Sequence, residues 1–323
     1  MKFCLLLIFI YKIAAFPTVI DDRVVFPDEL ENNQNSNDLN FNDLESRFDD
    51  DGGDLKLDLT PFLNDSNILK SDNDTEEFLY EEQSGGKPQY GDLFQGDIEL
   101  VPEQVKLLNG TGEDADLADR TGLISAVYRW PKNRNGKVIV PYIISSIDYS
   151  FKDRQRILLG MADIEKYTCI KFMPRSQQYD YIYIKSGSGC SSNLGKIGGK
   201  QTVSLLKNGC LNRSTVIHEL IHSLGFDHMQ NRSDRDIYVW IMWENIENKH
   251  KHNFEKVDSR RFKNFDTPYD YYSVMHYEPM AFSKNNKRTI LPKFKGYRNV
   301  IGQLNGMSHG DAKRLNRMYQ CKF

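Results

Sequence analysis

The sequence predicts an α+β domain of roughly 200 residues that follows a long acidic segment. One observation is a division of charge along the chain. Residues 21–120 hold 28 acidic and 7 basic residues, a balance of −21. Residues 121–323 hold 17 acidic and 33 basic residues, a balance of +16, and two lysines near the start complete the formal net charge of −3. The other observation is that segments of strand character come first in the basic part and helices later.

The composition limits the class of protein. The chain has 323 residues, of which 39% are hydrophobic and 12% aromatic, enough to build a core. Wholesale disorder and a collagen-like chain are therefore excluded. No apolar run reaches the roughly 18–20 residues that cross a bilayer, so a multi-pass membrane protein is excluded as well. The opposite charges of the two parts predict mutual attraction. The alternative is an acidic tail that only keeps the chain soluble.

The first strand is predicted at KVIVPYII (residues 137–144), where β-branched residues flank one proline. A helix is predicted over residues 153–168, because its apolar residues recur at helical spacing. Further strands are predicted at residues 170–172, 181–185 and 202–206. The alternation in YIYIK (residues 181–185) is typical of a half-exposed edge strand.

Two later helices complete the prediction. RSTVIHELIHSLG (residues 213–225) is helical in period and ends at Gly225, a residue typical of helix C-termini. SHGDAKRLNRMYQ (residues 308–320) begins at Ser308, a suitable N-cap with Asp311 three residues later.

The N-terminal region has the character of a targeting and linker segment. Residues 1–15 combine a positive start, a short apolar run and small residues for cleavage, which predicts a signal peptide and secretion. A buried N-terminal strand is the alternative. Residues 16 to about 90 are rich in Asp, Asn, Ser and Gly, so they are predicted to be largely flexible.

Secretion changes the interpretation of the cysteines. Four cysteines remain after the signal peptide, at positions Cys169, Cys190, Cys210 and Cys321, and an even number in an oxidising compartment predicts two disulfides. Spacing alone leaves all three pairings open. Acceptor patterns for N-glycosylation occur at Asn64, Asn73, Asn109, Asn212 and Asn231.

The segment HELIHSLGFDH carries the predicted chemistry. His218 and His222 are four residues apart, so on a helix their imidazoles share one face. Gly225 permits a left-handed backbone, which lets the chain turn back and His228 supply a third nitrogen. Three imidazoles leave zinc an open position for water, and Glu219 can accept the proton of that water. Three ligand-spaced histidines within eleven residues argue against ordinary core histidines.

This extended pattern is typical of metzincins, whose second mark is a methionine turn under the metal. SVMHY, with Met275 at its centre, fits that mark. The sequence here resembles the astacin family of secreted zinc endopeptidases. The resemblance runs from about Thr121 to Cys321 and rests on HELIHSLGFDH, SVMHY, RWP followed by VPYII, and YIYIKSGSGC. IGGKQTVSL and GMSHGDAKRLN are most similar to the hatching-enzyme branch.

The resemblance implies a two-lobed catalytic domain with a cleft between the lobes. It implies one zinc ion held by His218, His222 and His228, with Glu219 as general base and acid. Tyr277 would ligate the metal at rest and swing away to stabilise the oxyanion. YIYIK would line the cleft and receive the substrate as an added antiparallel strand. The implied disulfides are Cys169–Cys321 and Cys190–Cys210.

The resemblance also gives the acidic segment a role. FQGD matches the propeptide switch of the family, in which Asp97 would occupy the zinc position that catalysis needs for water. Activation would follow Arg120. The implied organisation is a signal peptide (residues 1–15), an inhibitory propeptide (residues 16–120) and a peptidase domain (residues 121–323), with no further module expected after Cys321.

One position departs from the family pattern. The family usually places a glutamate after the third histidine to pair with the new N-terminus, whereas this chain has Met229. The expected partners are a protein or peptide substrate, the chain's own propeptide and an activating protease, and neither nucleic acid nor a membrane span is expected. A non-cleaving, zinc-holding binding protein is the alternative function. The +16 surface could in addition bind an anionic matrix by charge.

Overall fold

The computed structural model describes residues 18–20, 23–25, 93–109, 126–259 and 262–322. The chain divides into two compact units, residues 1–69 and 70–323. In the first unit, β1 (Thr18–Ile20) and β2 (Arg23–Val25) pair antiparallel. The predicted signal peptide, most of the acidic stretch and the predicted cleavage after Arg120 lie outside the described residues. The described part contains no helix long and apolar enough to cross a membrane.

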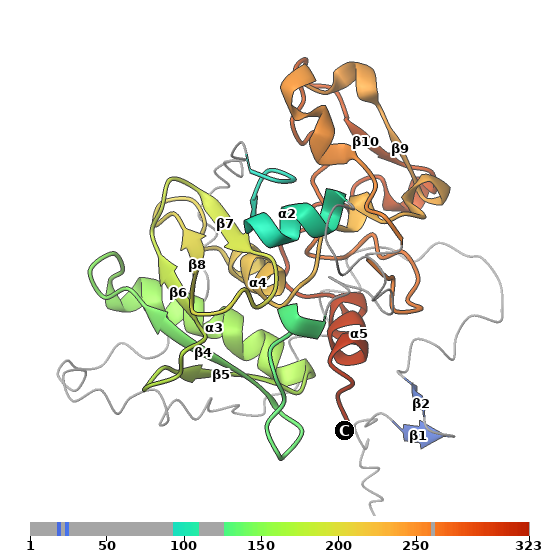
Figure 1. Ribbon diagram of the computed structural model, residues 1–323. Coiled ribbons are helices and arrows are strands. Elements are labelled where there is room, and N and C mark those ends of the chain that lie inside the picture. Colours follow the sequence, from blue (N-terminus) through green and yellow to red (C-terminus); the bar gives the residue numbers. More distant parts are fainter. Residues whose placement is uncertain (1–17, 21–22, 26–92, 110–125, 260–261, 323) are drawn as a thin grey trace, which may run out of the picture. The chain divides into compact units, whose positions relative to one another are not determined.

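A six-stranded mixed sheet forms the centre of the second unit, in the order β3-β7-β8-β6-β4-β5 (Figure 1). β4 pairs in parallel with β5 and β6, β6 pairs in parallel with β8, and β7 is antiparallel to β8. The strands are β3 (Ile98–Glu99), β4 (Val138–Ile144), β5 (Ile170–Pro174), β6 (Tyr181–Lys185), β7 (Cys190–Asn193) and β8 (Lys200–Leu205). All the strands predicted from residue 137 to 206 are present, and the sequence did not predict β3 or β7.

The prediction that YIYIK is an edge strand is wrong. These residues form β6, which is hydrogen-bonded on both sides, to β4 and to β8. Because both edges of β6 are occupied, it cannot accept a substrate as an added strand. The strand next to the predicted propeptide switch is β7, which pairs in parallel with β3.

The predicted helices are present with small changes at their ends. They are α3 (Phe151–Tyr167), α4 (Arg213–Ser223) and α5 (His309–Met318), and α2 (Pro102–Asn109) was not predicted. α5 begins after the predicted N-cap Ser308, which forms a capping box with Asp311. α3 begins two residues earlier than predicted, because Ser150 forms the same kind of box with Asp153.

Two apolar cores flank the segment that carries the histidines. The first joins the inner face of the sheet to α3, α4 and α5 and includes Ile157, Ile184 and Leu220. The second is built from residues 229–301, around Phe254 and Ile290. It includes the antiparallel pair β9 (Val239–Ile241) and β10 (Ile290–Pro292), drawn apart from the main sheet in Figure 1. Short 3-10 helices occur at residues 126–128, 229–231, 235–237, 243–245, 248–254 and 295–297.

Candidate metal centre and active site

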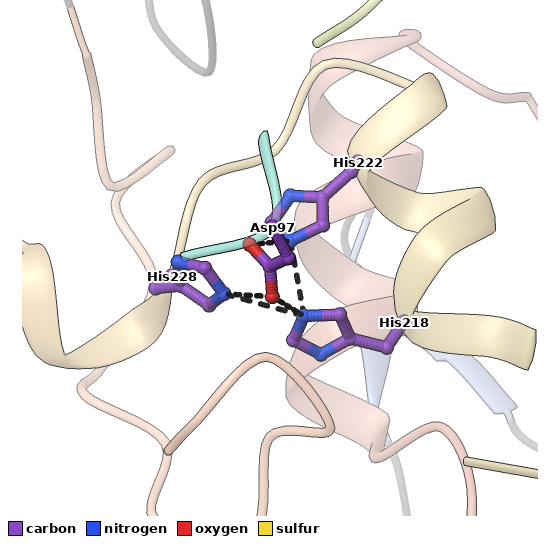
Figure 2. Close-up of side chains that lie close together, drawn as sticks. All are labelled: Asp97, His218, His222 and His228. Atoms are coloured by element: carbon purple, nitrogen blue, oxygen red, sulfur yellow. Dashed lines mark hydrogen bonds and ion pairs between the residues drawn. The ribbon is translucent and has the colours of Figure 1, made fainter. Parts of the chain in front are cut away.

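Four side chains converge on one point between the two cores (Figure 2). They are Asp97, His218, His222 and His228, and one ligand atom from each lies within 4.8 Å of the others. The Nε2 atom of His218 is 3.0 Å from Nε2 of His222 and 3.2 Å from Nε2 of His228. The carboxylate oxygen Oδ2 of Asp97 lies 3.2 Å from Nε2 of His228 and 3.3 Å from Nε2 of His218. Its Oδ1 is 3.6 Å from Nε2 of His222.

The outer nitrogen of each imidazole faces a carbonyl oxygen. A carbonyl can only accept a hydrogen bond, so each Nδ1 carries the proton and each Nε2 presents a lone pair to the centre. The acceptors are the Val274 backbone for His218 (2.8 Å), the Phe226 backbone for His222 (2.7 Å) and the side-chain Oε1 of Gln95 for His228 (3.0 Å).

This arrangement fits a tetrahedral zinc ion. Zinc–nitrogen bonds of 2.0–2.1 Å place neighbouring ligand nitrogens about 3.3 Å apart, close to the separations found here. Three lone pairs and a carboxylate that face one another repel unless a cation lies between them. In addition, Oδ1 of Asp97 is buried without a hydrogen-bond donor among the described residues. The donor set therefore suits zinc with three imidazoles and one carboxylate.

The end of α4 brings the third histidine to the other two. Gly225 has a φ of 98°, and its N–H donates to the His222 carbonyl at 2.8 Å. The N–H of Phe226 donates to the Ile221 carbonyl at 3.3 Å, which completes a Schellman motif. A Cβ at Gly225 would be strained at this φ and would lie 2.9 Å from the Met318 side chain. The same turn supplies the Phe226 carbonyl that orients His222.

Two of the candidate residues are carboxylic acids with shifted pKa values. Burial alone would raise the pKa of Asp97, but positive charge on the imidazoles of His228, His222 and His218 outweighs burial and lowers it. A cation held between neutral imidazoles would act in the same direction and keep this group a carboxylate. Burial raises the pKa of Glu219 well above its usual value, and the negative charges of Asp97 and Glu99 raise it further. Oε2 of Glu219 receives no hydrogen bond from the described residues. Both charges that act on Glu219 therefore come from the residues that precede α2.

Tyr277 and Met275 lie at the boundary between the cores. The ring of Tyr277 is 4.5 Å from the ring of His228, centroid to centroid, and its hydroxyl donates to the Gln95 carbonyl. Met275 is fully buried in the first core, and its carbonyl accepts from the N–H of Met229 at 2.8 Å.

Gln95 is a functional candidate that the sequence did not reveal. Its φ is 50°, its side chain is buried, and its amide joins two groups of the other segment. Nε2 donates to Oδ2 of Asp227 at 3.1 Å, while Oε1 accepts from Nδ1 of His228. The only sequence signal was its place inside FQGD, where the pattern allows any residue.

The segment around Asp97 is held along β7. The Ser192 N–H donates to the Asp97 carbonyl at 3.0 Å, and the Asn193 amide donates to the Glu99 carbonyl at 3.0 Å. Further along, the fully buried Gln104 donates to the Leu194 carbonyl at 2.7 Å. These bonds engage polar groups of residues 192–194, in β7 and directly after it.

Several other predicted positions can now be located. The disulfides are Cys169–Cys321 and Cys190–Cys210, the pairing that the resemblance implies. Met229 is fully buried in the second core. Asn231 is also fully buried and donates to the carbonyls of Asn253 and Glu255, so the folded protein cannot carry a glycan there.

Comparisons with known proteins agree with this geometry. The model of the astacin peptidase family matches residues 125–320. The low choriolytic enzyme of Oryzias latipes is 43% identical over 193 residues, 60% of this chain and 69% of the relative. The zinc metalloproteinase nas-4 of Caenorhabditis elegans is 38% identical over 236 residues, 72% of this chain and 71% of the relative. Among solved structures, the hatching enzyme zinc-protease HCE-1 of Oryzias latipes has a TM-score of 0.58 and 44% identity, covering 61% of this chain and 97% of that one.

The fold and the site define a metallopeptidase of the metzincin type. The family match covers more than half of the chain, and the chain belongs to the astacin family of zinc metalloendopeptidases.

Proposed function

We propose that the chain is the secreted zymogen of a zinc endopeptidase, with residues 1–15 as signal peptide, 16–120 as inhibitory propeptide and 121–323 as peptidase domain. In this proposal His218, His222 and His228 hold zinc, and Asp97 fills the fourth position until cleavage after Arg120 by another protease. The observation that carries it is the convergence of one carboxylate and three imidazoles whose outer nitrogens are all occupied by carbonyl oxygens.

The proposed chemistry divides between the metal and the protein. When bound, zinc supplies a Lewis acid that polarises the scissile carbonyl and lowers the pKa of a bound water to around 7. Glu219 takes the proton of the attacking water and passes it to the leaving nitrogen. The Tyr277 hydroxyl, released from the Gln95 carbonyl, donates a hydrogen bond to the developing oxyanion.

The test replaces the proposed base. Glu219→Gln keeps the size of the side chain but cannot accept the proton, so we expect it to bind zinc and lose nearly all peptide hydrolysis. Both proteins are treated with trypsin to remove the propeptide and assayed on casein and a fluorogenic peptide, with and without a chelator. Near wild-type turnover by Glu219→Gln would remove Glu219 from this role.

The same assay separates the alternative function. A non-cleaving binding protein would contain zinc but hydrolyse no peptide before or after trypsin treatment. The names of the choriolytic and hatching enzymes among its relatives make chorion proteins the first natural substrates to test.

A further inference from the structure

We propose that the apolar cluster around Ile98 is a substrate subsite that selects an aliphatic side chain within two residues of the cleaved bond. The proposal rests on the proposed peptidase function and adds to it a substrate class and the residues that select it. Leu194 and Phe262 form the subsite, with Tyr128 and Val257 at its margin.

Ile98 follows directly after Asp97, the residue that reaches the candidate metal. Its side chain is fully buried, in one cluster with Leu194 (0% exposed) and Phe262 (7% exposed). Since the metal marks the place of the reacting carbonyl, a side chain one residue away lies next to the reacting bond. The inhibitory segment therefore fills a position that a substrate residue takes after activation.

The backbone around Ile98 lies where a substrate strand would pair. Ile98 is aligned with Ser192 and Glu99 with Asn193 in the β3–β7 ladder. Without this segment, β7 becomes the edge of the sheet. The Ser192 N–H in β7 and the Leu194 carbonyl directly after it then become available to a bound peptide. Edge pairing fixes the backbone, and the adjacent pocket then selects the side chain.

The chemistry of the subsite favours an apolar occupant. Leu194, Phe262 and Val257 offer hydrocarbon surface in the cluster that buries Ile98, to which Phe94, Leu100, Leu107 and Leu108 of its own segment also contribute. The neighbouring residue Glu99 makes polar contacts instead, since its Oε1 accepts from the Ser191 hydroxyl at 2.8 Å. Of these two neighbouring positions, only that of Ile98 favours an apolar side chain.

The experiment uses the full chain, activated by trypsin and freed from trypsin by an inhibitor, with a peptide library as substrate. We expect Ile and Val to be preferred over Ser by about 10-fold or more in kcat/KM at one position within two residues of the cleaved bond. Phe262→Ala should reduce this preference several-fold. Phe294→Ala, which removes the same side chain from an exposed site, should leave the preference unchanged.

A charged substitution distinguishes a substrate subsite from a residue that only supports the structure. Phe262→Arg should shift the preference at that one position towards Asp and Glu, which a loss of stability cannot do. Efficient cleavage with no apolar preference within two residues of the bond, or the same preference in all variants, would overturn the subsite while leaving the peptidase function intact. No hydrolysis by the activated wild-type chain would overturn both.

Discussion

Gln95 and Asp97 act on different parts of the candidate centre. Asp97 faces the three inner nitrogens, whereas Gln95 binds the outer nitrogen of His228, the carboxylate of Asp227 and, through its carbonyl, the Tyr277 hydroxyl. In the proposed zymogen, Asp97 thus takes the fourth ligand position of the metal, and Gln95 restrains the ligand His228 and the candidate oxyanion donor Tyr277. We infer that inhibition depends on both.

Replacement of Gln95 should therefore raise the basal activity of the proposed zymogen. Gln95→Ala leaves the buried Nδ1–H of His228 and the buried carboxylate of Asp227 without their hydrogen bonds to Gln95. This should weaken binding of the segment by about 1–2 kcal/mol and raise basal hydrolysis roughly 5- to 30-fold. The measurement is peptide hydrolysis by the full chain without trypsin. Glu103→Ala, at an exposed position in α2, is the control and should not raise basal hydrolysis. Equal basal activity in the Gln95 variant and wild type would contradict the prediction.

The sequence could predict the three histidines, Glu219 and Gly225 because their chemistry depends on local spacing along one helix and one turn. Gln95 could not be predicted in this way. Its partner Asp227 is 132 residues away, and only the folded chain brings the two side chains together. The same holds for the Val274 carbonyl, which orients His218 from 56 residues away.

At the scale of elements, alternation along a strand reports its faces and not its edges. In β6, Ile182 and Ile184 are fully buried, while the rings of Tyr181 and Tyr183 lie under Arg175 and Lys200, respectively, on the other face. This produces the pattern of a half-exposed strand even though both edges are paired. β7 was not predicted, because Cys-Ser-Ser-Asn has little intrinsic strand preference. Its burial comes from neighbouring parts of the fold.

The capping box of α3 gives a pH-dependent contribution to stability. Burial alone would raise the pKa of Asp153, but hydrogen bonds from Ser150 and the charge of Lys207 outweigh burial and lower it from 3.8. A carboxyl group whose pKa is lower in the folded state stabilises the protein at pH values above its unfolded-state pKa. This stabilisation is lost as the pH falls through the folded-state pKa. Asp153→Asn should cost about 1 kcal/mol at pH 7. Urea unfolding at several pH values should show this difference shrinking as the pH falls towards 3.8 and below, and a constant difference would contradict the assignment.

The two disulfides should differ in their effect on stability. Cys169–Cys321 joins residues 152 apart and ties the C-terminal end to β5, whereas Cys190–Cys210 joins residues 20 apart. By loop-closure entropy, replacing both cysteines of the first pair by Ala should cost about 5 kcal/mol, against about 3 kcal/mol for the second. Denaturant unfolding of the two double variants is the measurement. A larger loss from the second pair would show that native-state contacts around β7 outweigh the entropy of the closed loop.

At the scale of the whole molecule, the segment from Leu93 to Asn109 behaves as a ligand bound to the rest of the second unit. It buries Gln95, Asp97, Ile98 and Gln104 against β7 and the candidate metal centre. The histidines lie in the sequence where residues of the first core give way to those of the second. The segment therefore contacts the region where the two cores meet. A ligand that binds only the folded state stabilises it, and its loss must lower stability.

Activation is therefore expected to leave a less stable catalytic chain. Burial of Ile98 and the hydrogen bonds of Gln95 and Gln104 together contribute about 2–4 kcal/mol, which corresponds to a fall of about 5–10 °C in the unfolding temperature. The measurement is scanning calorimetry of three zinc-loaded samples of the inactive Glu219→Gln chain: intact, cleaved by trypsin with the propeptide still associated, and cleaved with the propeptide removed by gel filtration. The first two should unfold at similar temperatures and the third lower, because stability depends on the contacts of the segment and not on its covalent link. Equal unfolding temperatures in the second and third samples would mean that the contacts of the segment add nothing to the folded catalytic chain.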